Sequence, residues 1–451
     1  MPMLTDLAAQ IEGRVIEDAD VLVAYETDQC MIAESEKPLA VVLASSVEDV
    51  QATLRFATEH GVAVVPRGAG TGLAGAANAL KDCIVLSLER MGRILEIDPV
   101  ARTARVEPGV LNADLDRAAR EHGLFYAPDP GSRAISTIGG NLATNAGGMC
   151  CAKYGVTADH VLRLTAVLID GEVVETGRAV RKDVAGLNLT RLLVGSEGSL
   201  AVIVEATVRL LPVPETAAIV AAVFPSVDAA ITAVLDVGCH VTPAAVELMD
   251  ATTVRAINEM TGMGLDESAG ATVLIEYDGP AAYGDAVQGV RLAEAAGATE
   301  CHVSSDPGER EALMNARRAA LPALEHMGST LLDDVSVPVH LLPAMLAAIR
   351  EISLRHEIVI GTFGHAADGN LHPTIVFDGA EPTSRMTATR AFEEIVETAL
   401  DLGGSISGEH GVGALKIPFM SRQHGERERE LMRGIKSVFD PDNLLNPGRA
   451  I

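Results

Sequence analysis

The feature that most constrains the fold is a glycine-rich segment, Pro66–Gly75, which directly follows a predicted strand at Val62–Val65. Its glycines match the spacing G-x-G-x-x-G, and glycine lets backbone N–H groups approach a pyrophosphate closely because it has no Cβ. Another strand is predicted from Cys83. Only residues 76–82 then lie between the glycine-rich segment and this strand, whereas the connection between two parallel strands needs about a dozen residues or more. The sequence therefore predicts a phosphate-binding loop outside a Rossmann unit, with no helix after it.

A second glycine-rich segment, Thr137–Gly148, contains four glycines, two asparagines and two threonines. These residues disfavour helix and strand, so we expect an irregular loop whose backbone and side-chain donors face a polar ligand. Either segment taken alone is equally compatible with an ordinary surface turn. Two such segments in one region, together with the short element Gly195–Gly198, favour a binding function.

Composition narrows the class of protein. The 451 residues predict two or three domains. The formal net charge of -27 disfavours binding to nucleic acid or anionic lipid, although solubility alone also explains it. An anionic substrate would need a local positive centre, either an arginine or a metal ion. None of the six cysteines forms a C-x-x-C pair, which argues against a disulfide framework, a zinc ribbon or an iron–sulfur cluster. We find no signal peptide, and the most apolar stretch, Ala217–Val237, is too interrupted to span a bilayer. A cytoplasmic protein is therefore expected.

Apolar periodicity predicts alternating strands and helices in residues 1–214, a compact α+β domain in 215–402, and a final segment with one helix in 403–451. The predicted strands are Leu39–Ala44, Val62–Val65, Cys83–Leu88, Arg105–Glu107, Val161–Ile169, Glu172–Glu175, Ala201–Leu211, Ile219–Phe224, Ala245–Leu248, Thr272–Tyr277, Ile358–Phe363 and Thr374–Phe377. The predicted helices are one from the N-cap Ser46 to Gly61, then Asn112–His122, Val227–Val237, Asp285–Ala296, Glu309–His326 and Glu426–Val438.

Two later segments combine histidine, carboxylate and glycine. In Gly364–His372, the turn signal Asp368-Gly369-Asn370 predicts a hairpin that brings His365 and His372 near each other. In Gly408–Gly413, Glu409 and His410 are adjacent in a bendable backbone. Two histidines and a carboxylate are a common ligand set for a divalent catalytic metal. The alternative is that these histidines only form local hydrogen bonds.

The motifs together resemble FAD-linked dehydrogenases of the p-cresol methylhydroxylase and vanillyl-alcohol oxidase superfamily. The similar branch contains D-lactate dehydrogenase, the glycolate oxidase catalytic subunit and D-2-hydroxyglutarate dehydrogenase. The resemblance extends from about Tyr25 to Gly448 and implies an α+β fold. In it, 1–214 would be a two-part FAD-binding domain, 215–402 an inserted cap domain, and 403–451 a segment that returns to the flavin and completes the active site. The motifs are Pro66–Gly75, Pro128–Pro130, Thr137–Gly148, Gly195–Gly198 and Asn446–Gly448.

The resemblance also implies which residues bind FAD. We expect non-covalent binding, because Gly68–Gly72 contains no histidine of the kind that covalent relatives carry there. The expected FAD-binding residues are Pro66, Arg67, Gly68, Ala69, Gly70, Thr71, Gly72, Pro130, Thr137, Gly139, Gly140, Asn141, Thr144, Asn145, Gly147, Glu197 and Asn446.

For the reaction, the resemblance implies that His365, His372 and Glu409 bind a divalent metal, zinc or manganese in our expectation, and that His410 is the general base. Arg317 would hold the substrate carboxylate, although the neighbouring Arg318 leaves the register open and a solvent-facing helix residue is the alternative. Asn370 would contact substrate or simply form the turn.

The sequence therefore predicts an FAD-dependent dehydrogenase that oxidises a small D-2-hydroxy acid such as D-lactate. Glycolate and D-2-hydroxyglutarate are alternative substrates. A non-redox flavin transferase, like alkyl-dihydroxyacetonephosphate synthase, is the alternative from another class. A quinone, a cytochrome or an electron-transfer flavoprotein would accept the electrons, and a homodimer is compatible with the resemblance.

Overall fold

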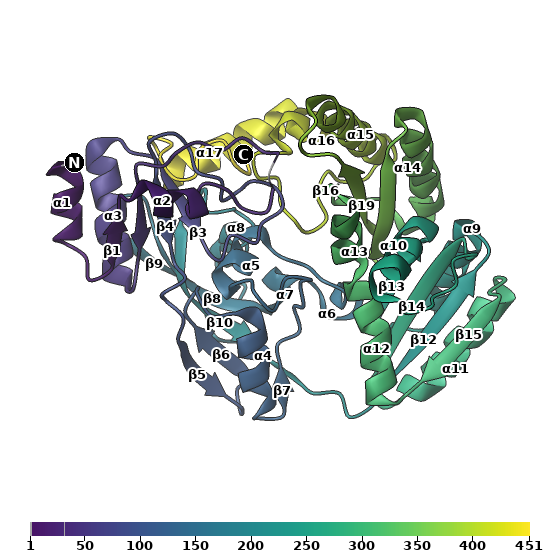
Figure 1. The fold of residues 1–451 in the computed structure, drawn as a ribbon. Helices are drawn as coiled ribbons and strands as arrows, with labels where there is room; N and C mark the ends of the chain where they lie inside the picture. Colours follow the sequence, from purple (N-terminus) through teal and green to yellow (C-terminus); the bar gives the residue numbers. More distant parts are fainter. Residues whose placement is uncertain (1, 31) are drawn as a thin grey trace. The chain divides into compact units, whose positions relative to one another are not determined.

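The computed structural model describes residues 2–30 and 32–451, which form two compact units (Figure 1). The first unit combines the stretch ending at Gly147 with Gly155–Val213 and Glu409–Ile451, and the second combines Gly148–Tyr154 with Pro214–Gly408. The second unit is thus an insertion into the first. Both mix helices and strands, which confirms the predicted α+β class.

The first unit begins with a four-stranded sheet of order β1-β2-β4-β3. Helix α3 (Val47–His60) has the predicted ends, because the Ser46 hydroxyl accepts the N–H of Asp49 and Gly61 adopts a left-handed conformation. The strands are β1 (Arg14–Ile16), β2 (Ala40–Leu43), β4 (Ile84–Ser87) and β3 (Val64–Arg67).

One prediction about this sheet is half right. No helix follows the first glycine segment, as expected, yet β3 and β4 are parallel neighbours. The expectation excluded a parallel crossover by counting only residues 76–82. The whole connection, residues 68–83, includes the glycine segment itself and is long enough to return the chain to the start of the next parallel strand.

A five-stranded antiparallel sheet of order β5-β6-β10-β8-β9 forms the other part of the first unit. The predicted hairpin between β8 and β9 is present. The strands are β5 (Ile94–Asp98), β6 (Thr103–Val106), β10 (Val202–Arg209), β8 (Val161–Val167) and β9 (Val173–Gly177), with a separate β7 (Leu124–Phe125) and β11 (Leu211–Pro212) pair.

The second glycine segment was predicted to be irregular, and this was wrong, because its first half forms helix α5 (Ile138–Thr144). The Thr137 hydroxyl caps the N-terminus, and Asn145 ends the helix in a left-handed conformation. Each glycine costs about 1 kcal/mol in a helix, but burial of two aliphatic side chains, Ile138 and Leu142, contributes about 1.5–3 kcal/mol each. Packing and caps therefore outweigh propensity.

The remaining helices complete the first unit. They are α1 (Pro2–Ala8), α2 (Ala19–Leu22), η1 (Val23–Tyr25), α4 (Asn112–Arg120), α7 (Thr157–His160), α8 (Leu189–Leu193), η3 (Ile417–Phe419), α16 (Met420–Gln423) and α17 (Glu426–Phe439).

The second unit is built on one antiparallel sheet of order β15-β12-β14-β13-β18-β19-β16, with β17 paired to β19. The strands are β15 (Glu300–Ser304), β12 (Ala217–Phe224), β14 (Ala271–Asp278), β13 (Ala245–Asp250), β18 (Val359–His365), β19 (Asn370–Phe377), β16 (Ser329–Leu332) and β17 (Val335–Ser336). The helices are α6 (Cys151–Tyr154), α9 (Val227–His240), α10 (Ala251–Thr261), α11 (Ala282–Ala295), α12 (Pro307–Arg318), α13 (Ala320–Met327), η2 (Val339–Leu341), α14 (Leu342–His356) and α15 (Pro382–Asp401).

Helices cover both faces of this sheet. A Cβ at Gly361 of β18 would meet Thr253 of α10 and Leu324 of α13, which places those helices on one face. Residue Glu276 of β14 points to that face and pairs with Arg310 of α12. Helix α11 packs on the opposite face. The face shared by α10, α12 and α13 also carries His365.

Helix Glu309–His326 was predicted as one element, but the structure divides it into α12 and α13 at Ala319. Pro322 explains the break, because a proline lacks the N–H of a regular helix and its ring clashes with the carbonyl of the residue four positions earlier, Arg318.

Candidate active site

The first glycine segment forms an open loop with unbonded donors. Among the described residues, none supplies a hydrogen-bond acceptor to the backbone N–H groups of residues 69–73, which are only partly buried. Gly70 has a φ of 69°, and a Cβ there would lie 2.0 Å from the Arg67 guanidinium. A Cβ on Gly68 would lie 2.4 Å from the Thr137 hydroxyl. The positive φ favours glycine at position 70 and the close approach of Thr137 favours it at position 68, and the loop has the donors that a pyrophosphate needs.

Helix α5 lies against this loop but has no donors to spare at its N-terminus. The N–H groups of Ile138 and Gly139 bond to the carbonyls of Val110 and Pro108, at 2.8 and 2.7 Å. The Gly140 N–H donates to the Thr137 hydroxyl at 3.2 Å. The expected ligands in this segment are therefore positioned to shape the wall of a site, while the first loop is suited to hold the phosphates.

Three other expected FAD-binding residues organise the framework. The buried carboxylate of Glu197 accepts the N–H groups of Val412 and Gly413 at 2.6 and 2.7 Å, and burial raises the pKa of Glu197 to about 7 although these bonds oppose the rise. Asn446 donates its amide to the Glu197 carbonyl at 2.6 Å. The Asn141 amide donates to the Ser136 hydroxyl and accepts from the Asn112 amide, both at 3.2 Å. Glu197 thus ties the loop after His410 to the glycine segments.

In the second unit, the register of neighbouring strands brings His365 and His372 close together. Glu247 of β13 lies directly opposite His365 of β18, and His365 lies opposite Asn370 of β19, two residues before His372. Side chains two residues apart share a face of a strand, so all four point to the same side. The Glu247 carboxylate and His365 Nδ1 are 2.7 Å apart, and the two histidine Nε2 atoms are 3.3 Å apart. His365, His372 and Glu247 are all buried.

This geometry suits a shared cation. Two imidazole nitrogens bound to one tetrahedral zinc at about 2.0–2.1 Å would be about 3.3 Å apart. A carboxylate can only accept, so His365 donates from Nδ1 and its Nε2 keeps a lone pair toward His372. Asp334, also buried, has a carboxylate oxygen 3.9 Å from His372 Nδ1. Such an excess of buried carboxylate around two imidazoles is chemically complementary to a divalent cation.

Arg317 resolves the register that the sequence left open. It is buried, whereas Arg318 bonds to Glu311 and Asn315 on the surface. The Arg317 Nε lies 2.7 Å from Glu247 Oε2, and its guanidinium carbon is 4.5 Å above the ring of Phe363. The outer edge with its two Nη atoms has no partner among the described residues, so it is available to a carboxylate.

Asn370 has the turn position that the sequence suggested. Its amide donates to Asp334 at 2.8 Å and to the Val335 carbonyl at 3.1 Å, which occupies it in holding the strands together. Ser407 donates to the other Asp334 oxygen at 2.8 Å. A Cβ on Gly408 would lie 2.1 Å from the Asn370 amide, so the chain approaches this turn closely just before Glu409.

Glu409 and His410 belong to the first unit by their contacts, and their side chains are 3.8 Å apart. Glu409 follows Gly408 by one peptide bond. Sequence reasoning missed Glu247 altogether. The signal was a single carboxylate in the apolar strand sequence A-V-E-L-M, where a charge is costly unless it has buried partners.

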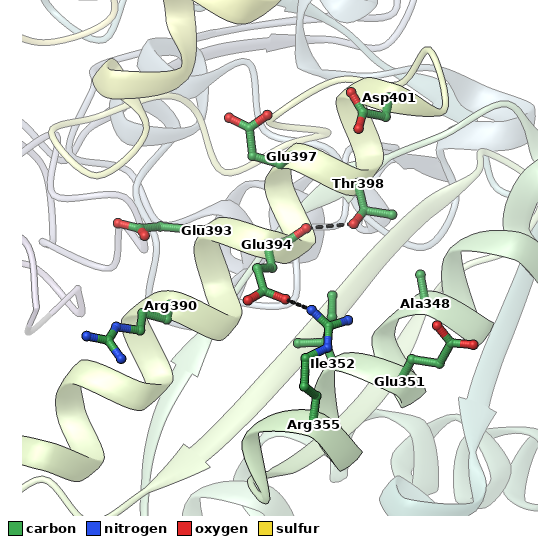
Figure 2. A pocket seen from close by; sticks show the side chains of 10 residues that line it. All are labelled: Ala348, Glu351, Ile352, Arg355, Arg390, Glu393, Glu394, Glu397, Thr398 and Asp401. Atoms are coloured by element: carbon green, nitrogen blue, oxygen red, sulfur yellow. Dashed lines mark hydrogen bonds and ion pairs between the residues drawn. The ribbon is translucent and has the colours of Figure 1, made fainter.

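A groove of about 530 Å³ lies between α14 and α15 (Figure 2). It is a charged surface groove in which Arg355 bonds to Glu394, and neither histidine of the β18–β19 hairpin lines it. Carboxylates outnumber arginines along it, which disfavours an anionic substrate here. The charged residues are Glu351, Arg355, Arg390, Glu393, Glu394, Glu397 and Asp401.

Comparison with known proteins decides the family. Residues 38–177 match the family described as "FAD binding domain", and residues 213–450 match "FAD linked oxidases, C-terminal domain". The chain belongs to the FAD-linked oxidases. It is 40% identical to glycolate oxidase subunit GlcD of Bacillus subtilis (strain 168), over 97% of this chain and 92% of that protein. It is 34% identical to a D-lactate dehydrogenase of Archaeoglobus fulgidus, over 100% and 99% of the two chains.

Solved structures agree on the fold of this FAD-linked oxidase. Substrate-bound p-cresol methylhydroxylase superimposes with a TM-score of 0.80 at 18% identity, over 100% of this chain and 96% of the other. The predicted superfamily and branch are therefore confirmed. The chain is an FAD-linked oxidoreductase, and FAD is its cofactor. Within the described residues, no helix is both long and apolar enough to cross a membrane.

Proposed function

We propose that this FAD-linked oxidase oxidises a small D-2-hydroxy acid of the lactate type to the 2-oxo acid, with non-covalent FAD and a divalent metal. The observation that carries the proposal is that buried His365 and His372 lie 3.3 Å apart on one sheet face, while Arg317 of the covering helix α12 contacts Glu247 on that same face. A 2-hydroxy acid needs both a cation near its hydroxyl and a fixed partner for its carboxylate. Relatives named glycolate oxidase subunit and D-lactate dehydrogenase act on substrates of that class.

The metal would be held by His365, His372 and Glu409. The first two have the nitrogen spacing of a shared ion, and Glu409 is the next residue after Gly408, which is packed against the turn at Asn370. Two histidines and one carboxylate leave coordination positions for a substrate and suit zinc or manganese. A divalent ion there would lower the pKa of the substrate hydroxyl.

Different side chains of the protein would then carry out separate parts of the reaction. Arg317 holds the substrate carboxylate through its two Nη atoms, which fixes the orientation of the hydroxyl-bearing carbon. A neutral His410 takes the hydroxyl proton on a ring nitrogen. FAD, when bound, would supply the acceptor for the hydride that leaves the same carbon. The alcohol loses a hydride from carbon and a proton from oxygen, two electrons and two protons in all, and the product is a 2-oxo acid.

Anaerobic mixing of the yellow protein with candidate substrates tests the proposal. D-Lactate should bleach the flavin absorbance, and L-lactate should not. Bleaching by glycolate or by D-2-hydroxyglutarate in preference would correct the substrate while keeping the reaction class. If none of the 2-hydroxy acids reduces the flavin, the proposed substrate class is wrong. A dye assay in the same screen identifies turnover with an acceptor other than NAD, such as a quinone or cytochrome.

A further inference from the structure

The carboxylate of Glu247 is enclosed between two groups to which the proposed function gives separate tasks. One oxygen lies 2.7 Å from His365 Nδ1, and the other lies 2.7 Å from Arg317 Nε. Glu247 has no exposed surface.

Such a buried ion pair is a poor device for stability alone. The free energy needed to remove two charges from water is about as large as the energy of their attraction. Well-packed apolar residues therefore often stabilise a core equally well. Glu247 also sits in a strand whose neighbours are otherwise apolar, Val246 and Leu248 among them. Its contacts, by contrast, have definite consequences for the two side chains that it touches.

The carboxylate determines which ring nitrogen of His365 carries the proton. Because it accepts from Nδ1, the neutral ring must carry its lone pair on Nε2, the atom that lies 3.3 Å from His372 Nε2. The other tautomer would place an N–H at that position and oppose a cation there.

Toward Arg317, the other carboxylate oxygen forms an ion pair with Nε at 2.7 Å, although the N–H is not aligned with it for a hydrogen bond. The planar group is also supported by Phe363 at 4.5 Å, so the remaining edge with both Nη atoms keeps one direction. A free arginine side chain would sample many rotamers and lose that orientation.

We propose that Glu247 is a positioning residue that sets the tautomer of His365 and the direction of Arg317 at once, and so couples metal binding to recognition of the substrate carboxylate. This inference rests on the proposed function for its metal and substrate. Its first part, the tautomer, is independent of both.

The test replaces Glu247 by Gln, which keeps the shape but removes the charge. The Glu276→Gln variant is the matched control. Glu276 lies on the same sheet face and pairs with Arg310 of the same helix α12 at 2.5 Å, but its side chain bonds to no histidine among the described residues. Both proteins are measured as FAD holoenzymes, with circular dichroism and flavin content as checks on folding.

Three readouts are expected to move in Glu247→Gln and not in Glu276→Gln. In metal-free protein labelled with ¹⁵N-histidine, the His365 resonances should change from the Nδ1–H tautomer to a mixture. The Kd for Co²⁺, measured by its visible absorption, should rise about 10- to 100-fold, the usual effect of losing a partner behind a metal ligand. The KM for the 2-hydroxy acid should rise about tenfold or more, as expected when a charged contact is weakened.

An unchanged tautomer together with an unchanged Co²⁺ affinity would overturn the role of Glu247. The His372→Ala variant separates this from failure of the proposed function. If His372→Ala binds Co²⁺ like the wild type, the metal assignment is wrong, whatever Glu247 does. If Glu247→Gln does not fold, Glu247→Asp keeps the charge but is one methylene too short to reach both partners, and it should show the same rise in Kd. Wild-type values in that variant would equally refute the inference.

Discussion

Glu197 should make the first unit less stable as the pH rises through neutrality. Burial raises the pKa of this carboxyl to about 7, whereas its ordinary value in an unfolded chain is about 4.5. Between these values the folded protein holds a proton that the unfolded chain has released. The free energy of unfolding must therefore fall with increasing pH across this window and level off above it.

The size of the effect follows from the two pKa values. A difference of about 2.5 units at about 1.36 kcal/mol per unit gives a loss of about 3 kcal/mol between pH 4.5 and pH 8. Other groups titrate in the same range, including Asp28, whose pKa burial raises to about 6. A variant is therefore needed to isolate the contribution of Glu197.

Glu197→Gln provides that comparison because an amide does not titrate. Its single carbonyl oxygen can accept from Val412 or from Gly413 but not well from both, so the variant should be less stable than the wild type at pH 5 by about 1–3 kcal/mol. As the pH rises, the wild type should lose this advantage and the two stabilities should converge or cross. Urea unfolding of the holoenzyme at pH 5, 6, 7 and 8, followed by circular dichroism, measures the difference. Parallel stability curves for the two proteins would refute the reasoning.

Three further outcomes are expected. His410→Ala should retain FAD but slow reduction of the flavin by about a hundredfold or more in stopped-flow measurements, and near-normal turnover would remove His410 from its role as base. His365→Ala and His372→Ala should lose bound metal and activity together by elemental analysis and dye assay, and a chelated wild type that stays fully active would count against the whole cluster. Gly68→Ala should retain less FAD after gel filtration because its Cβ would lie 2.4 Å from the Thr137 hydroxyl, whereas Gly131→Ala, with no atom within 4 Å of the new Cβ, should match the wild type.

Local signals in the sequence were sufficient for several elements. Helix α3 begins at the serine cap and ends at the glycine that the sequence predicts. The Asp-Gly-Asn turn forms the β18–β19 hairpin, also as predicted. The failures came from opposing local rules. Pro322 interrupts an otherwise helical pattern, and glycine propensity argues against α5 although burial of Ile138 and Leu142 stabilises it. Propensity is a small energy that packing overrides.

The residues of the candidate site also differ in whether a local sequence pattern could place them. Residues close in sequence, such as His365 and His372, could be placed together because a short turn fixes their geometry. Arg317 could be named from the resemblance, but its burial depends on the packing of α12, which no local pattern specifies. Glu247 is separated from His365 by more than a hundred residues and meets it only through the register of β13 with β18. Strand register across such a distance is a property of the whole sheet.

The two glycine segments illustrate why composition alone could not assign tasks within the site. Both are rich in glycine, and both were expected to offer backbone donors to the cofactor. In α5 the first N–H groups are used by the helix cap and by the carbonyls of Pro108 and Val110, whereas those of residues 69–73 have no acceptor within the described part of the chain. A donor that is already satisfied gains little from a phosphate, because a new bond must replace an existing one. The capacity to bind the pyrophosphate therefore depends on which glycine segment remains outside regular structure.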